Sequence, residues 1–353
     1  MTNTESLVFT CGNAEDESGG IFTHTVNERK GTLREVAHTS EKAVSYLAVH
    51  PGKETLYTVS GEDGGTVTTY RIEASSGELT KLNCQLSGGS DPCYISVDAT
   101  GCYAFVANYA GGSVSTFSIA EEGHLAGLQT VVHHEGSSVN PERQDVPHPH
   151  SIGPCPNNRF AYAPDLGTDQ VVIYEIDHET GNLLPADVPD APLHEGAGPR
   201  HFEFHPNKHV VYVINELDST VTTFNWDPET GGLDRTQSVS ALPEGYDGET
   251  YAADIHVHPS GEWVYASNRG HDSIAIFEVD ASGTLDLLNH QSTDGEWPRD
   301  FALDPDGRYL YVENQLSDSL VAFSIDGSTG ELTPTGHRQD FPEPVCLRFR
   351  NGA

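Results

Sequence analysis

The sequence predicts an all-β fold, a seven-bladed β-propeller, on three observations. An apolar strand recurs about every fifty residues along the 353-residue chain, and most copies end in Asn or Asp. Each copy follows a His-Pro, Asp-Pro or related turn and precedes a second apolar strand. Gly-rich turns separate the strands, and no helical periodicity accompanies them. Four short β-strands in a repeat of roughly 40 to 50 residues are typical of a propeller blade, whereas the alternative, a solenoid, is disfavoured by the missing helical period.

The recurring strand has six clear copies and one degenerate copy. The last residues of the copies are 46 to 57 residues apart, so seven units account for the whole chain. The clear copies are residues 56–60, 104–108, 161–165, 211–215, 264–268 and 310–314, and the degenerate copy is residues 8–11. A following strand is expected at residues 66–70, 113–117, 170–174, 220–224, 273–277 and 319–323. A turn and a further short strand come after it.

The two ends of the chain are predicted to share the seventh blade. Residues 344–350 have the pattern of a first strand with no second strand after it, and residues 6–10 have the pattern of a second strand with no first strand before it. Completing one blade from both ends removes the exposed sheet edge of an open ring. We therefore expect one domain over residues 1–353, although the length alone would allow two.

The composition limits the partners. Asp and Glu number 53 against 18 Lys and Arg, and the formal net charge is −35. This charge repels phosphate backbones and anionic lipids, so we expect neither nucleic acid nor a membrane as a partner. No segment has the pattern of a signal peptide or a transmembrane helix, which predicts a cytoplasmic protein. We expect a monomer or a weak homodimer.

The acidic residues are spread over turns instead of forming a tail. Only five of the basic residues are lysines: Lys30, Lys42, Lys53, Lys81 and Lys208. A distributed acidic surface poor in lysine is similar to that of halophilic, salt-adapted proteins. At low ionic strength such a surface is expected to repel itself and loosen the fold.

Propeller geometry identifies the positions where chemistry can occur. The residue that begins the innermost strand and the residue after its antiparallel neighbour lie on the same rim, near the axis. In chain order the first of these positions holds Ser45, Cys93, His150, Arg200, Ala253, Arg299 and Val345. The second holds Gly12, Gly61, Tyr109, Leu166, Glu216, Arg269 and Gln315.

One rim is therefore predicted to gather His150, Arg200, Glu216, Arg269 and Arg299 from consecutive blades. Guanidinium groups stay charged and suit an anionic substrate or a developing oxyanion. A Glu beside a water can act as general base, and a His can hold or deliver a proton. The arginines could instead neutralise carboxylates at the channel mouth.

The other histidines and the cysteines indicate no metal site. His50, His205 and His258 recur in the His-Pro turn and are expected to be turn residues. His148 and His150 are close in sequence, but their place on a turn argues against a metal. The six cysteines include no Cys-x-x-Cys pair and are expected to be small buried hydrophobes.

Two connections exceed the ordinary blade length. They are residues 131–147 and residues 241–252, and each leads directly into a rim position. Both are predicted to be lids or substrate-selecting loops.

The rim residues belong to stretches that resemble the seven-bladed lactonase family, which includes the propeller-type 6-phosphogluconolactonases and the fungal carboxymuconate lactonizing enzymes. The resemblance covers essentially the whole chain and is most specific between residues 196 and 305. The stretches are Gly196-Ala197-Gly198-Pro199-Arg200-His201, Phe204-His205-Pro206, Val213-Ile214-Asn215-Glu216-Leu217, Ala252-Ala253-Asp254-Ile255-His256 and Pro298-Arg299.

The resemblance implies a catalytic group of one His, two Arg and one Glu. Motif by motif, these fall on His150, Arg200, Glu216 and Arg269, with His148 as a competitor for the first. All four are among the five residues that strand counting places on one rim. His201, Asp254 and His148 are expected to contact or orient the substrate together with Arg299.

The leading hypothesis is hydrolysis of a sugar-acid lactone, in the first place 6-phosphogluconolactone. Glu216 would activate water, Arg200 and Arg269 would stabilise the oxyanion, and Arg299 would hold a phosphate or carboxylate. His150 would protonate the departing ring oxygen. The scheme requires no cofactor and no metal.

Two other functions fit the same sequence. A carboxymuconate-type cycloisomerase would run related chemistry in the direction of ring closure and stabilise the same anionic charge. A non-catalytic propeller would bind a ligand or a protein across one face. Only the enzymatic functions depend on the carboxylate of Glu216.

Overall fold

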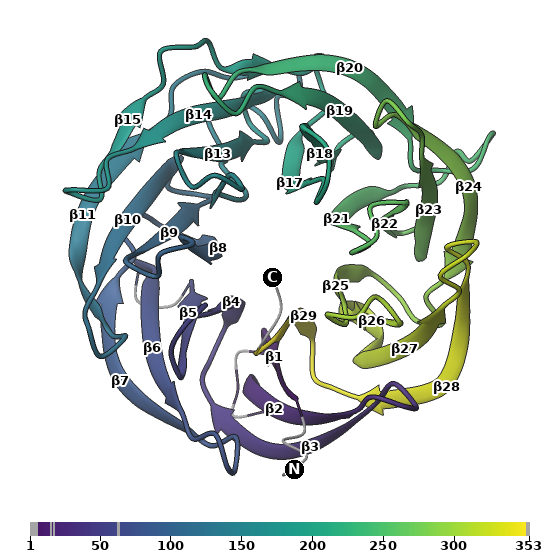
Figure 1. Cartoon of the computed structure of the whole chain (residues 1–353), viewed down its shortest axis with the longest axis horizontal. Coiled ribbons are helices and arrows are strands. Elements are labelled where there is room, and N and C mark those ends of the chain that lie inside the picture. The colour runs from purple at the N-terminus through teal and green to yellow at the C-terminus, as the bar shows by residue number, and fades with distance from the viewer. Residues whose placement is uncertain (1–5, 15, 17, 62–63, 351–353) are drawn as a thin grey trace.

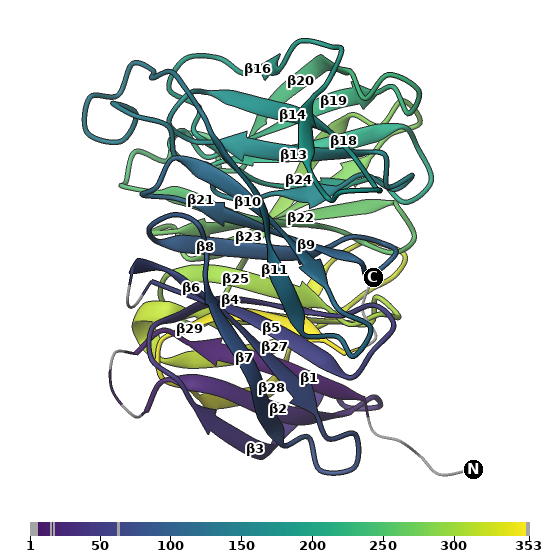
Figure 2. The ribbon, with the colours of Figure 1, turned by 90° about the vertical axis from the view of Figure 1, so that its left-hand side faces the viewer.

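The structure, a computed structural model, describes residues 6–14, 16, 18–61 and 64–350. Seven antiparallel sheets surround a central axis as blades (Figure 1). Figure 2, turned by 90°, shows neighbouring blades stacked against one another. The prediction of a seven-bladed β-propeller is confirmed. Residues 1–5 and 351–353, which belong to the expected domain, lie outside the described residues.

The first four blades follow the chain in order from the axis outward. The first has β4 (Val44–Val49), β5 (Thr55–Ser60), β6 (Thr66–Ile72) and β7 (Leu79–Leu86). The second has β8 (Pro92–Val97), β9 (Tyr103–Asn108), β10 (Ser113–Ile119) and β11 (Leu125–His133). The third has β12 (Gly153–Pro154), β13 (Phe160–Asp165), β14 (Gln170–Ile176), β15 (Leu183–Pro185) and β16 (Ala191–Pro192). The fourth has β17 (Pro199–Phe204), β18 (Val210–Asn215), β19 (Thr220–Trp226) and β20 (Leu233–Ser240).

The last three blades complete the ring. The fifth has β21 (Tyr251–Val257), β22 (Trp263–Arg269), β23 (Ser273–Val279) and β24 (Leu285–Ser292). The sixth has β25 (Pro298–Leu303), β26 (Tyr309–Asn314), the short 3-10 helix η2 (Gln315–Ser317), β27 (Ser319–Ile325) and β28 (Leu332–Asp340). The seventh joins β29 (Pro344–Phe349) to β1 (Leu7–Gly12), β2 (Gly20–Asn27) and β3 (Thr32–Ser40).

The core lies between the faces of adjacent blades. The second strand of a blade is packed on both faces, and β5 and β18, for example, are buried along their whole length. Such strands have continuous apolar runs because neither face meets water. The outermost strands, such as β7 and β20, contain no buried residue. Burial is thus complete in the second strand and lost in the outermost strand, which explains why the second strand was the clearest apolar repeat in the sequence.

Each His-Pro turn makes a hydrogen bond to the following blade. His205 accepts the amide N–H of Asn207 on Nδ1 at 3.0 Å, so Nε2 donates to the carbonyl of Gly261 at 2.9 Å. His258 makes the equivalent contact with the carbonyl of Gly307 at 2.8 Å. These histidines therefore have the turn role that the sequence predicts.

The seventh blade is assembled from the two ends of the chain. β29 is its innermost strand and pairs antiparallel with β1, which places Cys11 directly opposite Cys346. The expectation that all cysteines are buried is wrong at two positions, because Cys84 and Cys102 are exposed. Cys84 is in the outermost strand β7, and Cys102 is in the turn between β8 and β9, where each side chain meets solvent. Among the described residues, no helix is long and apolar enough to cross a membrane.

A buried carboxylic acid lies next to this closing blade. Glu313 of β26 is fully buried, and neither carboxyl oxygen has a hydrogen-bond partner among the described residues. Burial and the neighbouring Asp300 raise the pKa of Glu313 well above its usual value. Burial also raises the pKa of Asp300 to about 6, against the lowering effect of Arg348. Glu313 therefore favours the protonated form in the folded chain, whereas Asp300, paired with Arg348 at 3.0 Å, only releases its proton at a higher pH than an exposed Asp.

Unfolding is expected to become easier as pH rises. A raised folded pKa gives full stability below the unfolded value of 4.5, which is lost as pH rises through the folded pKa. Each such group removes about 1.4 kcal/mol per pH unit in that window. Glu313→Gln cannot ionise, so its unfolding free energy should fall less than that of the wild type between pH 5 and pH 8. Urea unfolding at both pH values measures this, with Glu331→Gln at an exposed turn as the control. Equal pH slopes in wild type and Glu313→Gln would contradict it.

Candidate active site

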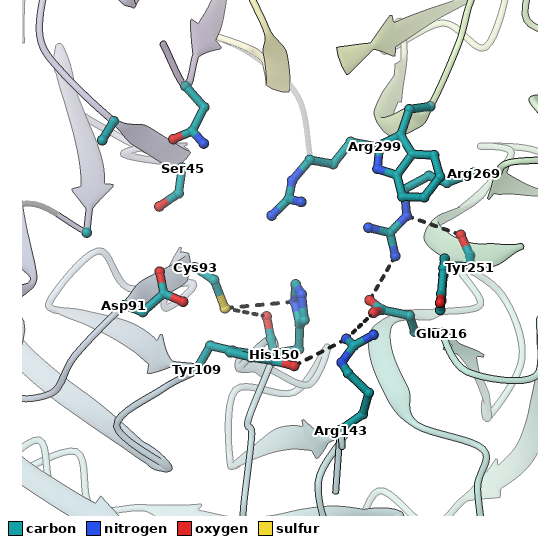
Figure 3. A pocket seen from close by; sticks show the side chains of 14 residues that line it. Ser45, Asp91, Cys93, Tyr109, Arg143, His150, Glu216, Tyr251, Arg269 and Arg299 are labelled. Carbon is teal, nitrogen blue, oxygen red and sulfur yellow. Dashed lines mark hydrogen bonds and ion pairs between the residues drawn. The ribbon is translucent and has the colours of Figure 1, made fainter. Parts of the chain in front are cut away.

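A cavity of about 790 Å³ opens at the rim of the central channel (Figure 3). Four of its walls come from the predicted first-strand positions, occupied by Ser45, Cys93, His150 and Arg299. Four positions that strand counting selected, in blades that are far apart in the sequence, thus line one cavity.

The predicted second-strand positions supply four more residues of the same rim. Gly61, Tyr109, Glu216 and Arg269 line the cavity. Arg200 contacts Glu216 but is 2% exposed and does not line the cavity. Thus His150, Glu216, Arg269 and Arg299 face the cavity, and Arg200 lies directly behind it.

A repeated β-bulge aims the first-strand side chains. In β17, Pro199 pairs with Asn215 and His201 pairs with Ile214, so Arg200 is an extra residue with no cross-strand partner. In β25, β8 and β4, Arg299, Cys93 and Ser45 likewise have no cross-strand partner. A bulge breaks the alternation of the strand and redirects the extra side chain. A proline commonly precedes it, because proline has no N–H to lose from the ladder.

Glu216 stands at the centre of a guanidinium cluster. Arg143 Nη2 donates to its Oε1 at 2.6 Å. Arg269 Nη2 lies 2.9 Å from Oε2, and Arg200 Nε donates to the same oxygen at 3.1 Å. Charge-assisted bonds of this length hold the carboxylate between the three cations.

The cluster sets the protonation state of Glu216. Burial alone would raise the pKa of its carboxyl, but the three guanidinium groups, Arg269 foremost, lower it to about 2. The carboxylate is ionised at neutral pH and weakly basic. This differs from the raised pKa that general bases usually have, and its physical reason is the number of cations in contact with one carboxylate.

Arg200, His201 and Asp254 form a buried support behind the cavity. Arg200 Nη1 donates to the carbonyl of Ala253, and His201 Nδ1 lies 2.7 Å from Asp254 Oδ1. Burial and Arg200 lower the pKa of His201 to about 3. His201 and Asp254 are 4% and 2% exposed and do not line the cavity. They lie behind the cavity wall, where a side chain can orient the residues that face the cavity, and their expected contact with substrate stays a prediction.

His150 presents a neutral imidazole to the cavity. Burial first, and then Arg200, His201 and Arg299, lower its pKa well below 6.5. Cys93 Sγ lies 3.8 Å from Nδ1 and 3.3 Å from the backbone oxygen of His150 (Figure 3). Nε2 has no hydrogen-bond partner among the described residues.

His148 supports the wall without lining the cavity. Its ring stacks on Tyr109 with centroids 4.4 Å apart, and its Nδ1 lies 3.0 Å from the Tyr109 carbonyl oxygen. Tyr109 in turn meets His150 edge to face at 5.4 Å. Of the two histidines that the sequence offered, the structure places His150 in the cavity and His148 beside it.

Arg299 is the unpaired cation of the site. Its guanidinium has no ion pair or hydrogen bond among the described residues, and Figure 3 shows it pointing into the cavity. Burial lowers the pKa of Arg299, and Arg200 lowers it further. A guanidinium in this state has donors available for an anionic ligand.

Arg143, Tyr251 and Trp297 line the cavity and were missed by strand counting. Arg143 comes from the long connection that leads to β12. Tyr251 begins β21, and the Arg269 guanidinium lies 5.5 Å from the ring centre of Trp297. The sequence signal for Arg143 and Tyr251 was the unusual length of the two connections, both predicted to be functional.

The connection that carries Arg143 is held in place by buried polar groups. Gln144 is fully buried and donates from Nε2 to Leu166 O and Asp169 Oδ1, both at 2.8 Å. Asp169 also accepts the amides of Gly196 at 2.6 Å and Gly198 at 2.7 Å. This connection is therefore an anchored wall, whereas a lid needs a segment with few such bonds.

The arrangement suits an anionic substrate with a reacting carbonyl. Three guanidinium groups line the cavity against the carboxylates of Glu216 and Asp91, in a chain whose formal charge is −35. Fixed donors of this kind stabilise an oxyanion as it develops. In the described part of the chain, no group of three or more His, Cys, Asp and Glu residues is arranged to hold a metal ion.

Comparison with known proteins gives consistent matches over the whole chain. The family model of lactonases described as seven-bladed β-propellers matches residues 7–349. The 6-phosphogluconolactonase of Bacillus subtilis (strain 168) is 37% identical over 335 residues, which cover 94% of this chain and 95% of that protein. The 6-phosphogluconolactonase of Pectobacterium carotovorum is 34% identical over 260 residues and covers 73% of each chain. The solved structure of the periplasmic gluconolactonase of Pseudomonas aeruginosa superimposes with a TM-score of 0.92 at 31% identity and covers 98% of each chain.

Proposed function

This chain belongs to the seven-bladed β-propeller lactonase family, and from that membership we propose that it hydrolyses 6-phosphogluconolactone to 6-phosphogluconate. Relatives that cover most of the chain are named for this lactone hydrolysis. The chain is accordingly a lactone hydrolase, and the lactone of a phosphorylated sugar acid is the substrate that its site suits best.

The observation that carries this substrate is the excess of cations in the cavity. Arg143, Arg269 and Arg299 face it, and Arg299 has no anionic partner among the described residues. An unpaired, half-buried guanidinium destabilises the folded chain. Binding of a phosphate would offset this cost.

Glu216 and His150 handle the proton in the proposed mechanism. Glu216 accepts a proton from the water that attacks the lactone carbonyl carbon. The neutral His150 takes this proton on Nε2 and delivers it to the ring oxygen when the ring C–O bond breaks. The acid product then ionises, so the reaction consumes one water and releases one proton.

Different arginines contact the two negative charges of the reacting substrate. Arg269 stabilises the tetrahedral oxyanion, and Arg299 holds the phosphate. Arg200 is too deeply buried to touch the substrate. It positions Glu216 and contacts the His201 ring. This role replaces the oxyanion contact that the sequence suggested for Arg200.

A panel of three reactions tests the proposed function. The rate of ring opening is measured with freshly prepared 6-phosphogluconolactone and δ-gluconolactone, after subtraction of spontaneous hydrolysis, and cyclisation is measured with a carboxymuconate. Fastest turnover of the phosphorylated lactone supports the proposal. Preference for the carboxymuconate would favour the cycloisomerase, and no turnover in any reaction would favour a ligand-binding propeller.

We also propose a cytoplasmic, salt-adapted protein that acts as one domain, as a monomer or weak homodimer. The support is the formal charge of −35 and the exposure of the acidic turns. Several of these carboxylates also have a local role, since Asp177 Oδ1 and Asp227 Oδ1 accept the amides of Glu179 and Glu229 at 2.9 Å. Cell fractionation and light scattering test the location and the assembly.

The melting temperature is expected to rise with salt. Screening reduces repulsion between surface carboxylates, so Tm should increase by about 5 °C or more between 0.1 M and 2 M KCl. Thermal unfolding followed by circular dichroism measures this, with sorbitol as an uncharged control that strengthens burial without screening. A flat or falling Tm in KCl would contradict the salt adaptation.

A further inference from the structure

Arg143 differs from the other two cations that hold Glu216. Its side chain is 35% exposed, whereas those of Arg200 and Arg269 are 2% and 7% exposed. Arg269 Nε is additionally bonded to the Tyr251 carbonyl at 3.1 Å. Arg143 is therefore the partner of Glu216 that can leave at the lowest cost.

Apart from its bond to Glu216, the Arg143 guanidinium makes only weak contacts among the described residues. Apart from Glu216, its hydrogen-bond partner among the described residues is the hydroxyl of Tyr109, 3.3 Å away. The centre of the Tyr251 ring lies 5.9 Å from the guanidinium carbon. A neutral hydroxyl and a ring face compete weakly with an anion for a guanidinium.

The backbone that carries Arg143 is held by hydrogen bonds, whereas its side chain is partly exposed. The Arg143 amide donates to Asn140 Oδ1 at 3.2 Å, and the next residue, Gln144, is anchored to Asp169. Asp169 also binds the turn that leads into β17, which carries Arg200. Asp169 and Gln144 are thus positioning residues that keep the Arg143 side chain within reach of both Glu216 and the cavity.

The two oxygens of Glu216 have different partners. Oε2 is bonded by both Arg200 and Arg269, and Oε1 is bonded by Arg143. Departure of Arg143 would uncover Oε1 and leave the carboxylate held through Oε2. A carboxylate with one cation fewer is a stronger base.

We propose, on the basis of the proposed function, that Arg143 is a gate operated by the substrate: an anionic group of the substrate draws Arg143 away from Glu216 Oε1, and the uncovered oxygen accepts the proton of the attacking water. One O–H bond of water breaks, its oxygen bonds to the lactone carbonyl carbon, and the proton passes from Glu216 through His150 to the ring oxygen. Glu216 ends ionised, and Arg143 returns when the product leaves.

The charged and titratable groups that face Glu216 allow this exchange. They are Tyr109 after β9, Arg143 before β12, Arg200 in β17, Tyr251 in β21, Arg269 in β22 and Arg299 in β25. With Arg143 on the substrate, Arg200 and Arg269 still balance the ionised carboxylate. The gate therefore makes the phosphate raise kcat as well as lower KM.

The test supplies the anion separately from the lactone. Hydrolysis of δ-gluconolactone is measured with and without sodium phosphite, at constant ionic strength, in wild type, Arg143→Gln and Arg143→Lys. Phosphite should raise kcat/KM of the wild type by about tenfold or more and should have no effect on Arg143→Gln. Arg143→Lys keeps the charge and should keep part of the activation.

The matched control is Arg159→Gln, whose side chain is half exposed and pairs with Glu229 at a distance of 3.8 Å, outside the cavity. This variant should respond to phosphite like the wild type. Inhibition of the wild type by phosphite without activation would overturn the gate, as would equal activation in Arg143→Gln. A wild type that opens neither lactone would overturn the proposed function and the gate with it, whereas turnover of both lactones with equal losses in Arg143→Gln would overturn the gate alone.

Discussion

Replacing Glu216 with glutamine is expected to lower kcat/KM for 6-phosphogluconolactone by about a thousandfold or more. The carboxylate accepts the proton of water in the proposed mechanism, and loss of such a group typically costs 10² to 10⁴ in rate. The amide also removes the anion that holds Arg143, Arg200 and Arg269 together, so the geometry of the site is lost with the base.

The same substitution is expected to destabilise the protein. Arg200 and Arg269 would remain buried without a counter-charge, which costs about 3–5 kcal/mol and should lower Tm by about 5 °C or more. Inorganic phosphate should restore more Tm to Glu216→Gln than to the wild type, because it can replace the lost anion.

Glu229→Gln at the surface is the matched control, since its side chain is 87% exposed and pairs weakly with Arg159. It should leave both activity and Tm unchanged. Wild-type turnover in a folded Glu216→Gln would contradict the role given to this carboxylate.

Arg299→Gln is expected to weaken catalysis and strengthen the fold. The substitution removes a guanidinium that has no anionic partner among the described residues, so Tm should rise by about 1–3 °C. It also removes the proposed phosphate contact, so kcat/KM for 6-phosphogluconolactone should fall about a hundredfold, mainly through KM. Steady-state kinetics and thermal unfolding of the same preparation measure both effects.

The unphosphorylated lactone distinguishes contacts with the phosphate from contacts with the lactone ring. For δ-gluconolactone the loss in Arg299→Gln should be tenfold at most, because this substrate has no phosphate to lose. Arg299→Lys should fall between the two, since an ammonium keeps the charge without the paired donors. Equal losses for both lactones would place Arg299 at the reacting carbonyl instead.

Much of the fold was predictable because each blade repeats the same local physics. The second strand is buried on both faces, so its apolar run marks every blade, and the predicted strands at residues 66–70 and 220–224 begin where β6 and β19 begin. The closing blade followed from counting unmatched strands at the two ends. The third blade departs from the pattern, since its innermost strand is reduced to Gly153–Pro154.

The site was predictable as far as it depends on the repeat. Counting strands placed His150, Glu216, Arg269 and Arg299 around one cavity. The prolines before several rim residues, such as Pro199 and Pro298, are a signal of the bulges that went unused. The burial of Arg200 could not be predicted, because strand counting gives it the same position in its blade as Arg299, which lines the cavity.

Arg143 was beyond strand counting because it belongs to no repeated position. Its place next to Glu216 depends on hydrogen bonds that join Gln144 to Asp169, across three segments of the chain. Only the length of the connection indicated a function, and length does not identify which side chain acts. The low basicity of Glu216 could not be predicted for the same reason, because the low pKa depends on contacts with all three arginines, Arg143 included.

The most direct test of this account is the rate at which the wild-type protein opens freshly prepared 6-phosphogluconolactone in molar KCl, followed by proton release in a pH-stat. The account predicts hydrolysis well above the spontaneous rate, with kcat/KM of about 10⁴ M⁻¹ s⁻¹ or higher. A rate equal to spontaneous opening, from a protein shown to be folded under the same conditions, would contradict it.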